Sequence, residues 1–216
     1  MPYCLNPICQ KPNNPDGREF CANCGSRLNK VWRGNLQTSI PEYPLFDLVL
    51  RQLLEQLTES LNFGQWQEGD RLTNEIILGL TNKSQIAKLT ADDINQIPCD
   101  IWIAIDQAWM QASNHRFGWS AQQQIWKRLG GRLIYEQNTY WEFANIYEKF
   151  SDRVGWRKPR WLNLSISPKV WRKYENLTFA IAAPTGHLPS LLFWEGFNLV
   201  DTIFYRLEVC ADRRSR

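Results

Sequence analysis

The sequence predicts an all-α protein with a small separate unit at its N-terminus, and three observations indicate this. After about residue 44, apolar residues recur mainly at spacings of three and four, the period of an amphipathic helix. Strand-like alternation is confined to Leu162, Leu164 and Ile166. Four of the six cysteines lie within the first 24 residues. We therefore expect a metal-binding unit at residues 1–28, a linker at 29–46, a helical domain at 47–210 and a basic tail at 211–216.

The helical domain is predicted to open with two amphipathic helices. Residues 47–61 and residues 66–80 each carry an apolar stripe, and Gly64 is a plausible stop between them. Thr90 followed by Asp93 predicts a short capped helix next. The two stripes consist of Leu50, Leu53, Leu54, Leu57 and Leu61, and of Leu72, Ile76, Ile77 and Leu80.

The remaining helices are predicted from their first residues. Pro98 stands where the first turn of a helix needs no N–H. Ser120 with Gln123, and Thr139 with Glu142, have the spacing of capping boxes. The stripes behind these starts are Ile101, Trp102, Ile105, Ala108, Trp109 and Ala112, then Ile125, Trp126 and Leu129, then Tyr140, Phe143, Ala144, Tyr147 and Phe150, and, behind an expected cap at Asn198, Leu199, Val200, Ile203, Phe204 and Leu207.

Composition argues against several classes of function. The net charge is +3 and there are two histidines, so generic polyanion binding and histidine-based catalysis are not expected. Asp92-Asp93 fits the first turn of a helix better than a catalytic pair, and no nucleotide-binding or hydrolase motif is present. Residues 1–20 lack the order of a signal peptide. We therefore expect a cytoplasmic binding protein that is not an enzyme.

The N-terminal cysteines have the spacing of a zinc site. Cys4, Cys9, Cys21 and Cys24 supply four thiolates in two close pairs, the number that a closed tetrahedral site needs. Free thiols and an iron–sulfur cluster are the alternatives. The segment resembles the short zinc ribbon of many cyanobacterial signalling proteins, which implies a structural zinc ion and an adaptor role. Cys99 and Cys210, far from this cluster, are expected as small buried hydrophobes.

A basic, tryptophan-containing stretch precedes a long uncharged one. Between Arg153 and Lys173 there are seven basic residues, no acidic ones and three tryptophans. The 19 residues from Asn176 to Trp194 carry no charged side chain. A large, flat, apolar ligand with carboxylates at its edge would match both stretches, and a porphyrin has this chemistry. The alternatives are that the tryptophans belong to the core and the basic residues to a solvated rim, or that bases of single-stranded nucleic acid stack on the tryptophans.

Several separate motifs of the chain have a characteristic order and spacing. They are Ile105-Asp-Gln-Ala-Trp109, Arg116-Phe-Gly-Trp-Ser-Ala-Gln122, Ile125-Trp126, Asp152-Arg-Val-Gly-Trp-Arg157, Leu177-Thr-Phe179 and Ala183-Pro-Thr-Gly-His-Leu-Pro189. In order and spacing they resemble the Genomes Uncoupled Four family, and the resemblance spans roughly Leu48 to Cys210, about three quarters of the chain.

The resemblance implies a compact helical domain that binds protoporphyrin IX or magnesium protoporphyrin IX in an open apolar cleft. It also implies stimulation of magnesium chelatase, or tetrapyrrole sensing, in chlorophyll synthesis. Expected partners are the tetrapyrrole, the large subunit of the chelatase, a protein bound by the zinc ribbon and, at its periphery, a membrane; nucleic acid is not expected. Carried over, the tetrapyrrole-binding residues are Phe117, Trp119, Arg153, Arg157, Trp161, Phe179, Thr185, His187, Leu188 and Leu191.

The sequence allows two alternatives, one for the role of its histidines and one for its function. His115 and His187 are candidate axial ligands of a bound metal, although a lone histidine is more often a structural donor. The alternative function is a cytosolic signalling adaptor, in which the helical domain and the zinc ribbon both contact protein and no tetrapyrrole is bound.

Overall fold

The computed structural model describes residues 44–132, 140–157 and 171–214, and these residues form an all-α fold, as the sequence predicts. Extended pairing within the described ranges is limited to a single bridge between Arg157 and Trp171. The predicted strand at Leu162–Ile166 lies outside these ranges. The α-helices are α1 (Pro44–Asn62), α2 (Trp66–Thr81), α3 (Ala91–Gln96), α4 (Cys99–Ala112), α5 (Trp119–Arg128), α6 (Tyr140–Arg153) and α7 (Leu191–Arg214), and Ile86–Lys88 (η1) and Tyr174–Asn176 (η4) are short 3-10 turns.

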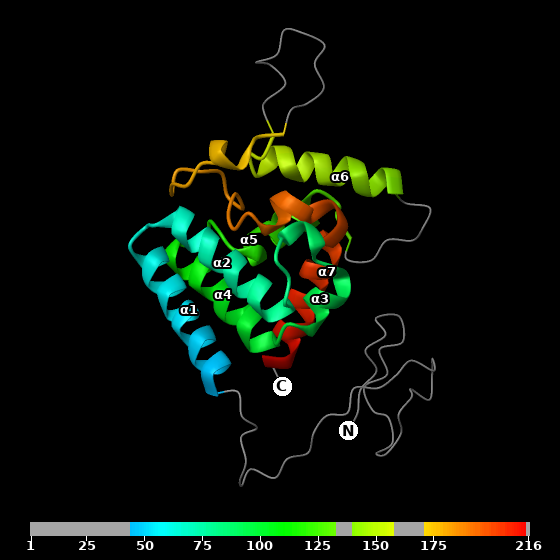
Figure 1. The fold of residues 1–216 in the computed structure, drawn as a ribbon. Coiled ribbons are helices and arrows are strands. Elements are labelled where there is room, and N and C mark those ends of the chain that lie inside the picture. The colour runs from blue at the N-terminus through cyan, green and yellow to red at the C-terminus, as the bar shows by residue number, and fades with distance from the viewer. Residues whose placement is uncertain (1–43, 133–139, 158–170, 215–216) are drawn as a thin grey trace, which may run out of the picture. The chain divides into compact units, whose positions relative to one another are not determined.

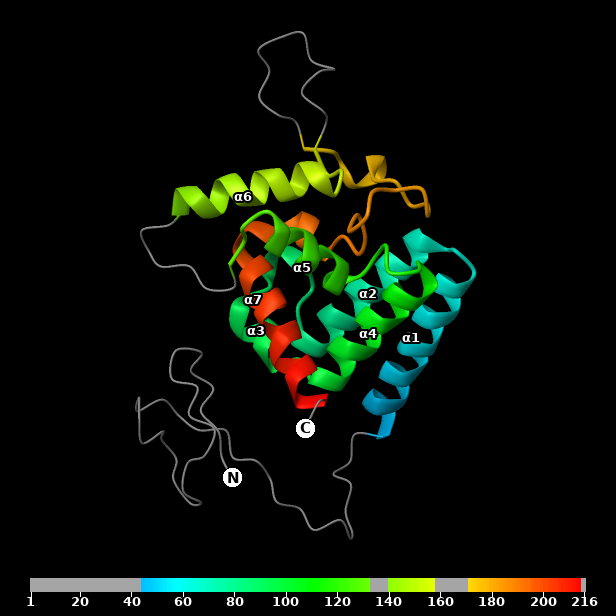
Figure 2. The same ribbon diagram turned by 180° about the vertical axis from the view of Figure 1, so that it is seen from behind.

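The helices surround one core in two groups. Helices α1, α2 and α4 run side by side, and α7 packs behind them against α3, α4 and α5 (Figures 1 and 2). Helix α6 crosses one end of this assembly, where it contacts α5 and α7. No helix among the described residues has both the length and the hydropathy needed to cross a membrane.

The α1–α2 hairpin depends on two glycines. Gly64 turns the chain after α1 with a φ of +69°, a conformation that side chains with a Cβ rarely adopt. Gly69 lies where α2 meets α1, and a Cβ there would stand 2.4 Å from Cδ2 of Leu61. The two helices can therefore approach closely and bury the predicted leucine stripe of α1, of which Leu57 and Leu61 are fully buried.

Aromatic side chains fill the core between the helices. Trp126 of α5 meets Phe143 and Phe150 of α6 at centroid distances of 5.6 and 5.7 Å, and Phe204 of α7 at 6.1 Å. Trp102 of α4 lies edge-on to Trp119, with 4.5 Å between their centroids. Each such pair adds about 0.5–1.5 kcal/mol beyond its buried area. Among the described residues, the tryptophans buried in this core are Trp66, Trp102, Trp109, Trp119, Trp126 and Trp156.

The Thr90 capping box is confirmed at the start of α3: the Thr90 hydroxyl accepts from the Asp93 N–H, and the Asp93 carboxylate accepts from the Thr90 N–H. Two other predicted starts are wrong. Helix α5 begins at Trp119, and Ser120 donates to Asp106 of α4 instead of capping its own helix, with 2.9 Å from its N to Oδ1. Helix α7 begins at Leu191, seven residues before the expected cap at Asn198.

Candidate functional site

Most of the predicted tetrapyrrole-binding residues lie in or beside the segment that joins α6 to α7. We call residues 154–190 the connection; residues 154–157 and 171–190 of it are described. Its described part lies against the end of the helical assembly where α2 begins and α4 ends (Figures 1 and 2). The Arg116 side chain, just after α4, donates to the carbonyls of Ile181 and Ala183 at 3.1 and 2.8 Å. Gln122 of α5 donates to Gly186 and Pro189 at 3.0 and 2.9 Å.

Two residues within the basic stretch are paired through their backbones. Arg157 and Trp171 form the antiparallel bridge, and Arg172 N donates to the Trp156 carbonyl at 2.9 Å. The Arg157 guanidinium lies 5.8 Å from the centre of the Trp171 ring, a cation–π distance. It is 4% exposed and faces Glu148 at 3.2 Å and Asp152 at 3.4 Å. Arg157 is therefore a buried, ion-paired arginine within the basic stretch.

Trp171 is an exposed aromatic residue at this pairing. It is 39% exposed and packs against Tyr147 of α6 at 5.8 Å and Phe193 of α7 at 6.2 Å. Trp171 is one of the three tryptophans of the basic stretch, but the family resemblance predicted Trp161 as the tetrapyrrole-binding one. Trp161 lies outside the described residues. Arg153, in the last turn of α6, is exposed.

Four other predicted residues are part of the packed interior. Phe117 contacts the Trp66 ring at 5.3 Å and Trp119 contacts Trp102, and both are fully buried. Leu188 and Leu191 are also buried. In contrast, Phe179 is partly buried against Tyr174, and Thr185 is exposed. A role for any of these residues in tetrapyrrole binding stays a prediction.

His187 is held on both ring nitrogens. Its Nδ1 lies 2.6 Å from the Val154 carbonyl, and its Nε2 accepts from the Thr178 N–H at 2.9 Å. These partners fix the neutral form with the proton on Nδ1, and burial lowers the pKa of the ring. His187 thus links two parts of the connection through its ring. This agrees with a structural role for the histidine rather than with a role as an axial ligand of a bound metal. His115 is exposed at a φ of +62°.

A buried carboxylate that the sequence analysis did not single out holds the connection on α2. Asp70 is fully buried and accepts from the Ser190 N–H and hydroxyl, both at 2.6 Å, and from the Tyr174 hydroxyl at 3.0 Å. Burial raises the pKa of Asp70 despite these three donors. Burial and the neighbouring carboxylate also raise the pKa of Tyr174.

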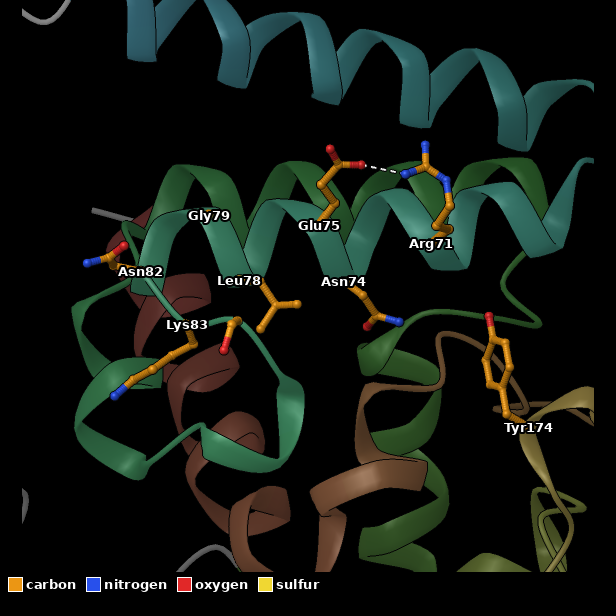
Figure 3. A pocket seen from close by; sticks show the side chains of 9 residues that line it. Arg71, Asn74, Glu75, Leu78, Gly79, Asn82, Lys83 and Tyr174 are labelled. Atoms are coloured by element: carbon orange, nitrogen blue, oxygen red, sulfur yellow. Dashed lines mark hydrogen bonds and ion pairs between the residues drawn. The ribbon is translucent and has the colours of Figure 1, made fainter.

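A hollow lies along the solvent side of α2 beside Tyr174. Its volume is about 640 Å³. Tyr174 stands at one end with its hydroxyl toward α2, and Arg71 is ion-paired with Glu75 along its edge (Figure 3). None of the predicted tetrapyrrole-binding residues that the structure describes lines this hollow. Its lining consists of Arg71, Asn74, Glu75, Leu78, Gly79, Asn82, Lys83, Ser84 and Tyr174.

Comparison with known proteins decides the family. A family model described as GUN4-like matches residues 51–206. The chain belongs to the GUN4-like family. This match confirms the family that the sequence motifs predict, and it includes every described contact between the connection and helices α2, α5 and α6.

Individual relatives of this GUN4-like chain are distant. The Ycf53-like protein of Synechocystis sp. (strain ATCC 27184 / PCC 6803 / Kazusa) is 24% identical over 151 residues, which are 68% of this chain and 55% of that protein. The chain thus spans about half the length of this curated relative. The ligand-free structure of Arabidopsis thaliana GUN4 matches with a TM-score of 0.51 at 19% identity, over 77% of this chain and 95% of the other, and shows a shared fold. GUN4 from Chlamydomonas reinhardtii gives a TM-score of 0.48 at 19% identity, over 79% and 95%.

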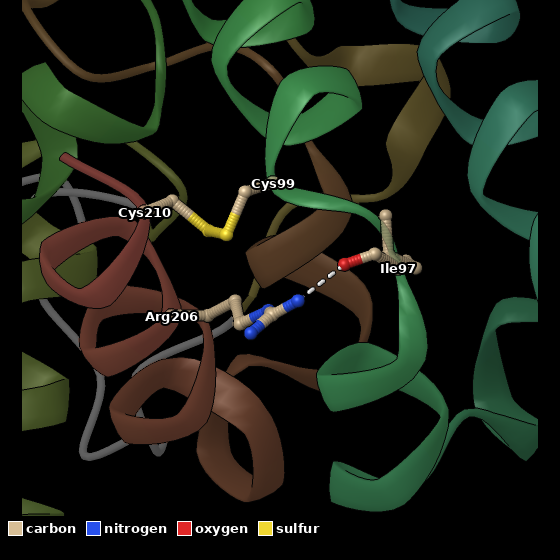
Figure 4. Close-up of a disulfide and its surroundings, with 4 residues drawn as sticks. All are labelled: Ile97, Cys99, Arg206 and Cys210. Carbon is tan, nitrogen blue, oxygen red and sulfur yellow. Dashed lines mark hydrogen bonds between the residues drawn. A yellow bond between two sulfur atoms is a disulfide. The ribbon is translucent and has the colours of Figure 1, made fainter. Parts of the chain in front are cut away.

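A disulfide joins two helices of the GUN4-like domain and corrects the expectation of two free buried cysteines. Cys99 at the start of α4 is bonded to Cys210 near the end of α7, 111 residues later, with 5.1 Å between the Cα atoms. The Arg206 side chain donates to the Ile97 carbonyl at 2.6 Å beside it (Figure 4). Spacing along the chain could not reveal this pair, because the packing of α7 on α4 brings it together.

The predicted zinc ligands Cys4, Cys9, Cys21 and Cys24 of the GUN4-like chain lie outside the described residues. Within residues 44–132, 140–157 and 171–214, no three His, Cys, Asp or Glu side chains are grouped so that they could hold a metal ion. The zinc ribbon therefore stays a prediction from spacing.

Proposed function

We propose that this chain is a tetrapyrrole-binding regulator. Its ligands would be protoporphyrin IX and magnesium protoporphyrin IX, and it would stimulate magnesium chelatase or sense tetrapyrroles in chlorophyll synthesis. The observation that carries this proposal is the GUN4-like match over residues 51–206. The family assignment supports action by binding rather than catalysis. A location in the cytoplasm and contact with the large chelatase subunit are part of the same proposal.

The accessible groups of the connection suit such a ligand. Trp171, Phe179 and Ile181 offer aromatic and aliphatic surface, and Trp171 and Ile181 are 39% and 47% exposed. A flat macrocycle gains contact area on such side chains. Arg153, exposed where α6 meets the connection, supplies a guanidinium that can take a propionate through two hydrogen bonds.

The buried members of the predicted set are assigned a supporting role. Leu188 of the connection is buried, as are Phe117, Trp119 and Leu191, and Gly118 N donates to the Leu188 carbonyl at 3.0 Å. Arg157 holds Trp171 in place from beneath through the cation–π contact. We assign direct ligand contact to Arg153, Phe179, Thr185 and the predicted residue Trp161, together with Trp171 and Ile181.

A titration of the full chain with protoporphyrin IX and its magnesium complex tests this function. Tryptophan quenching and the shift of the porphyrin absorption band should both saturate. Arg153→Gln should weaken binding about two- to fivefold, the range of an exposed ion pair. Arg128→Gln, an exposed arginine in the last turn of α5, is the matched control and should bind like the wild type. Quenching that rises linearly without saturation would contradict the proposal and favour a protein-binding adaptor.

We also propose that Cys4, Cys9, Cys21 and Cys24 hold a structural zinc ion. Four thiolates in two close pairs match the donor number and softness that tetrahedral zinc prefers. Elemental analysis of the full chain should give one zinc per protein, lost in Cys21→Ser/Cys24→Ser. Iron with a visible charge-transfer band, or metal retained in the double variant, would overturn this assignment.

A further inference from the structure

One carboxylate holds both ends of the stretch 174–190. Tyr174 begins this stretch and Ser190 ends it, and their hydroxyls share the same Asp70 oxygen, at 3.0 and 2.6 Å. The second Asp70 oxygen accepts from the Ser190 N–H at 2.6 Å. The two ends of the stretch, 16 positions apart in the sequence, therefore meet at a single buried group on α2.

The stretch between these ends has little regular structure of its own. After the single turn of η4, its internal hydrogen bonds come from short turns and from Thr178 to His187. Phe179 is partly buried, whereas Ile181 and Thr185 are exposed. Because few contacts made within the stretch fix its course, the positions of these three side chains depend on anchors supplied by the helices.

We infer that Asp70 is a positioning residue for ligand binding: it fixes the 174–190 stretch in the course that presents Phe179, Ile181 and Thr185. This inference rests on the proposed function. Asp70 does not touch the ligand itself, since it is completely buried beneath Ser190 and Tyr174.

A second buried carboxylate, that of Asp106, has a local role. Asp106 also accepts from the N–H and the hydroxyl of a serine, Ser120, and is 7% exposed. Its partner lies 14 residues away at the start of α5, whereas Ser190 lies 120 residues from Asp70. Asp106 holds the start of one helix, and Asp70 holds the ends of the connection stretch. The pair is therefore a matched control.

The test compares variants of the full chain by hydrogen exchange and by protoporphyrin IX titration. Tyr174→Phe removes one bond to Asp70 and should raise exchange of the Leu177, Thr178 and Ala183 amides about fivefold, with porphyrin binding weakened by a similar factor. Asp70→Ala removes all three bonds and should do more. Asp70→Asn should rescue both readouts, because its amide can accept from the Ser190 N–H and donate to the two hydroxyls.

Asp106→Ala separates positioning from general loss of stability. It should lower the melting temperature and raise exchange in the first turn of α5, while exchange at residues 177–183 and porphyrin affinity stay within about twofold of the wild type. Unchanged exchange in 174–190 for Tyr174→Phe would overturn the role of Asp70, even if Asp70→Ala does not fold. If exchange responds and the wild type binds no porphyrin, the proposed function fails and the anchoring by Asp70 stands.

Discussion

The helical body, residues 44–128 with α7, and the connection are held in different ways. Helices of the body meet through apolar and aromatic side chains, such as Trp102 against Trp119. The connection also buries apolar side chains, such as Leu177 and Leu188, but in addition polar side chains of the body, among them Asp70, Arg116 and Gln122, bond its backbone and hydroxyls. Packing supplies free energy without strict direction, whereas hydrogen bonds specify a conformation. The body thus stabilises the fold, and a few polar groups set the course of the candidate site.

The largest loss of stability is expected from Trp126→Ala. Trp126 is fully buried among Phe143, Phe150 and Phe204, so its removal leaves a cavity where three helices meet. The free energy of unfolding should fall by about 3–5 kcal/mol in urea denaturation. Phe63→Ala, at a side chain that is 74% exposed, should change it by less than about 0.5 kcal/mol. Equal losses in the two variants would contradict the claim that buried aromatic packing stabilises the body.

Loss of the disulfide should follow in size. The bond closes a 111-residue separation, and its removal should cost about 2–4 kcal/mol. Urea unfolding of the wild type with and without a thiol reductant measures this cost. Cys99→Ala/Cys210→Ala serves as the control, since it should be insensitive to reductant at this pair. If the free energy of unfolding of the wild type is the same with and without the reductant, the disulfide is not formed in solution.

Gln122→Met tests a single polar anchor of the connection. It removes the bonds to Gly186 and Pro189 and leaves two buried carbonyls without those donors, at a cost of about 1–3 kcal/mol. Hydrogen exchange at Gly186 and His187 should rise. The matched variant is Gln123→Met, because Gln123 donates to Phe204 of α7 at 2.7 Å instead. It should leave exchange in the connection unchanged, and a similar rise in both variants would refute the local effect.

The smallest effect expected is a dependence of stability on pH. Burial raises the pKa of Asp70, Asp106 and Asp201. Above the unfolded pKa of about 3.9, the folded state keeps protons that the unfolded state has released, so stability falls as pH rises through each folded pKa. Asp70→Asn should remove up to about 1.4 kcal/mol per pH unit of this fall. Parallel stability curves for wild type and variant between about pH 4 and 7 would contradict the raised pKa.

Sequence patterns located most helices because their signals are local. The stripes at spacings of three and four placed α1, α2 and α4, and the Thr90 box placed α3. The starts of α5 and α7 were misplaced because tertiary partners replace local caps there. Asp106 accepts a hydrogen bond from the hydroxyl of Ser120, and Asp70 accepts one from the hydroxyl of Ser190, directly before α7.

The candidate site was harder to predict than the fold. Motifs identified the family and pointed to the connection as the candidate site, which stays a prediction, but they could not separate exposed from buried residues. His187 illustrates this, because both of its ring partners, Val154 and Thr178, become known only from the folded chain. Asp70 carried no sequence signal at all, since its partners are 104 and 120 residues away.

The pairing of Arg157 with Trp171 also bears on protein engineering. Arg157 and Trp171, the described residues on either side of residues 158–170, are joined by a backbone bridge and are therefore neighbours in the fold. Doubling the length of a closed loop costs only about 0.6 kcal/mol of chain entropy. A fluorescent reporter domain could therefore be inserted after residue 158 with little strain on the helices. Such a fusion would be a genetically encoded sensor of a ligand that binds at Trp171.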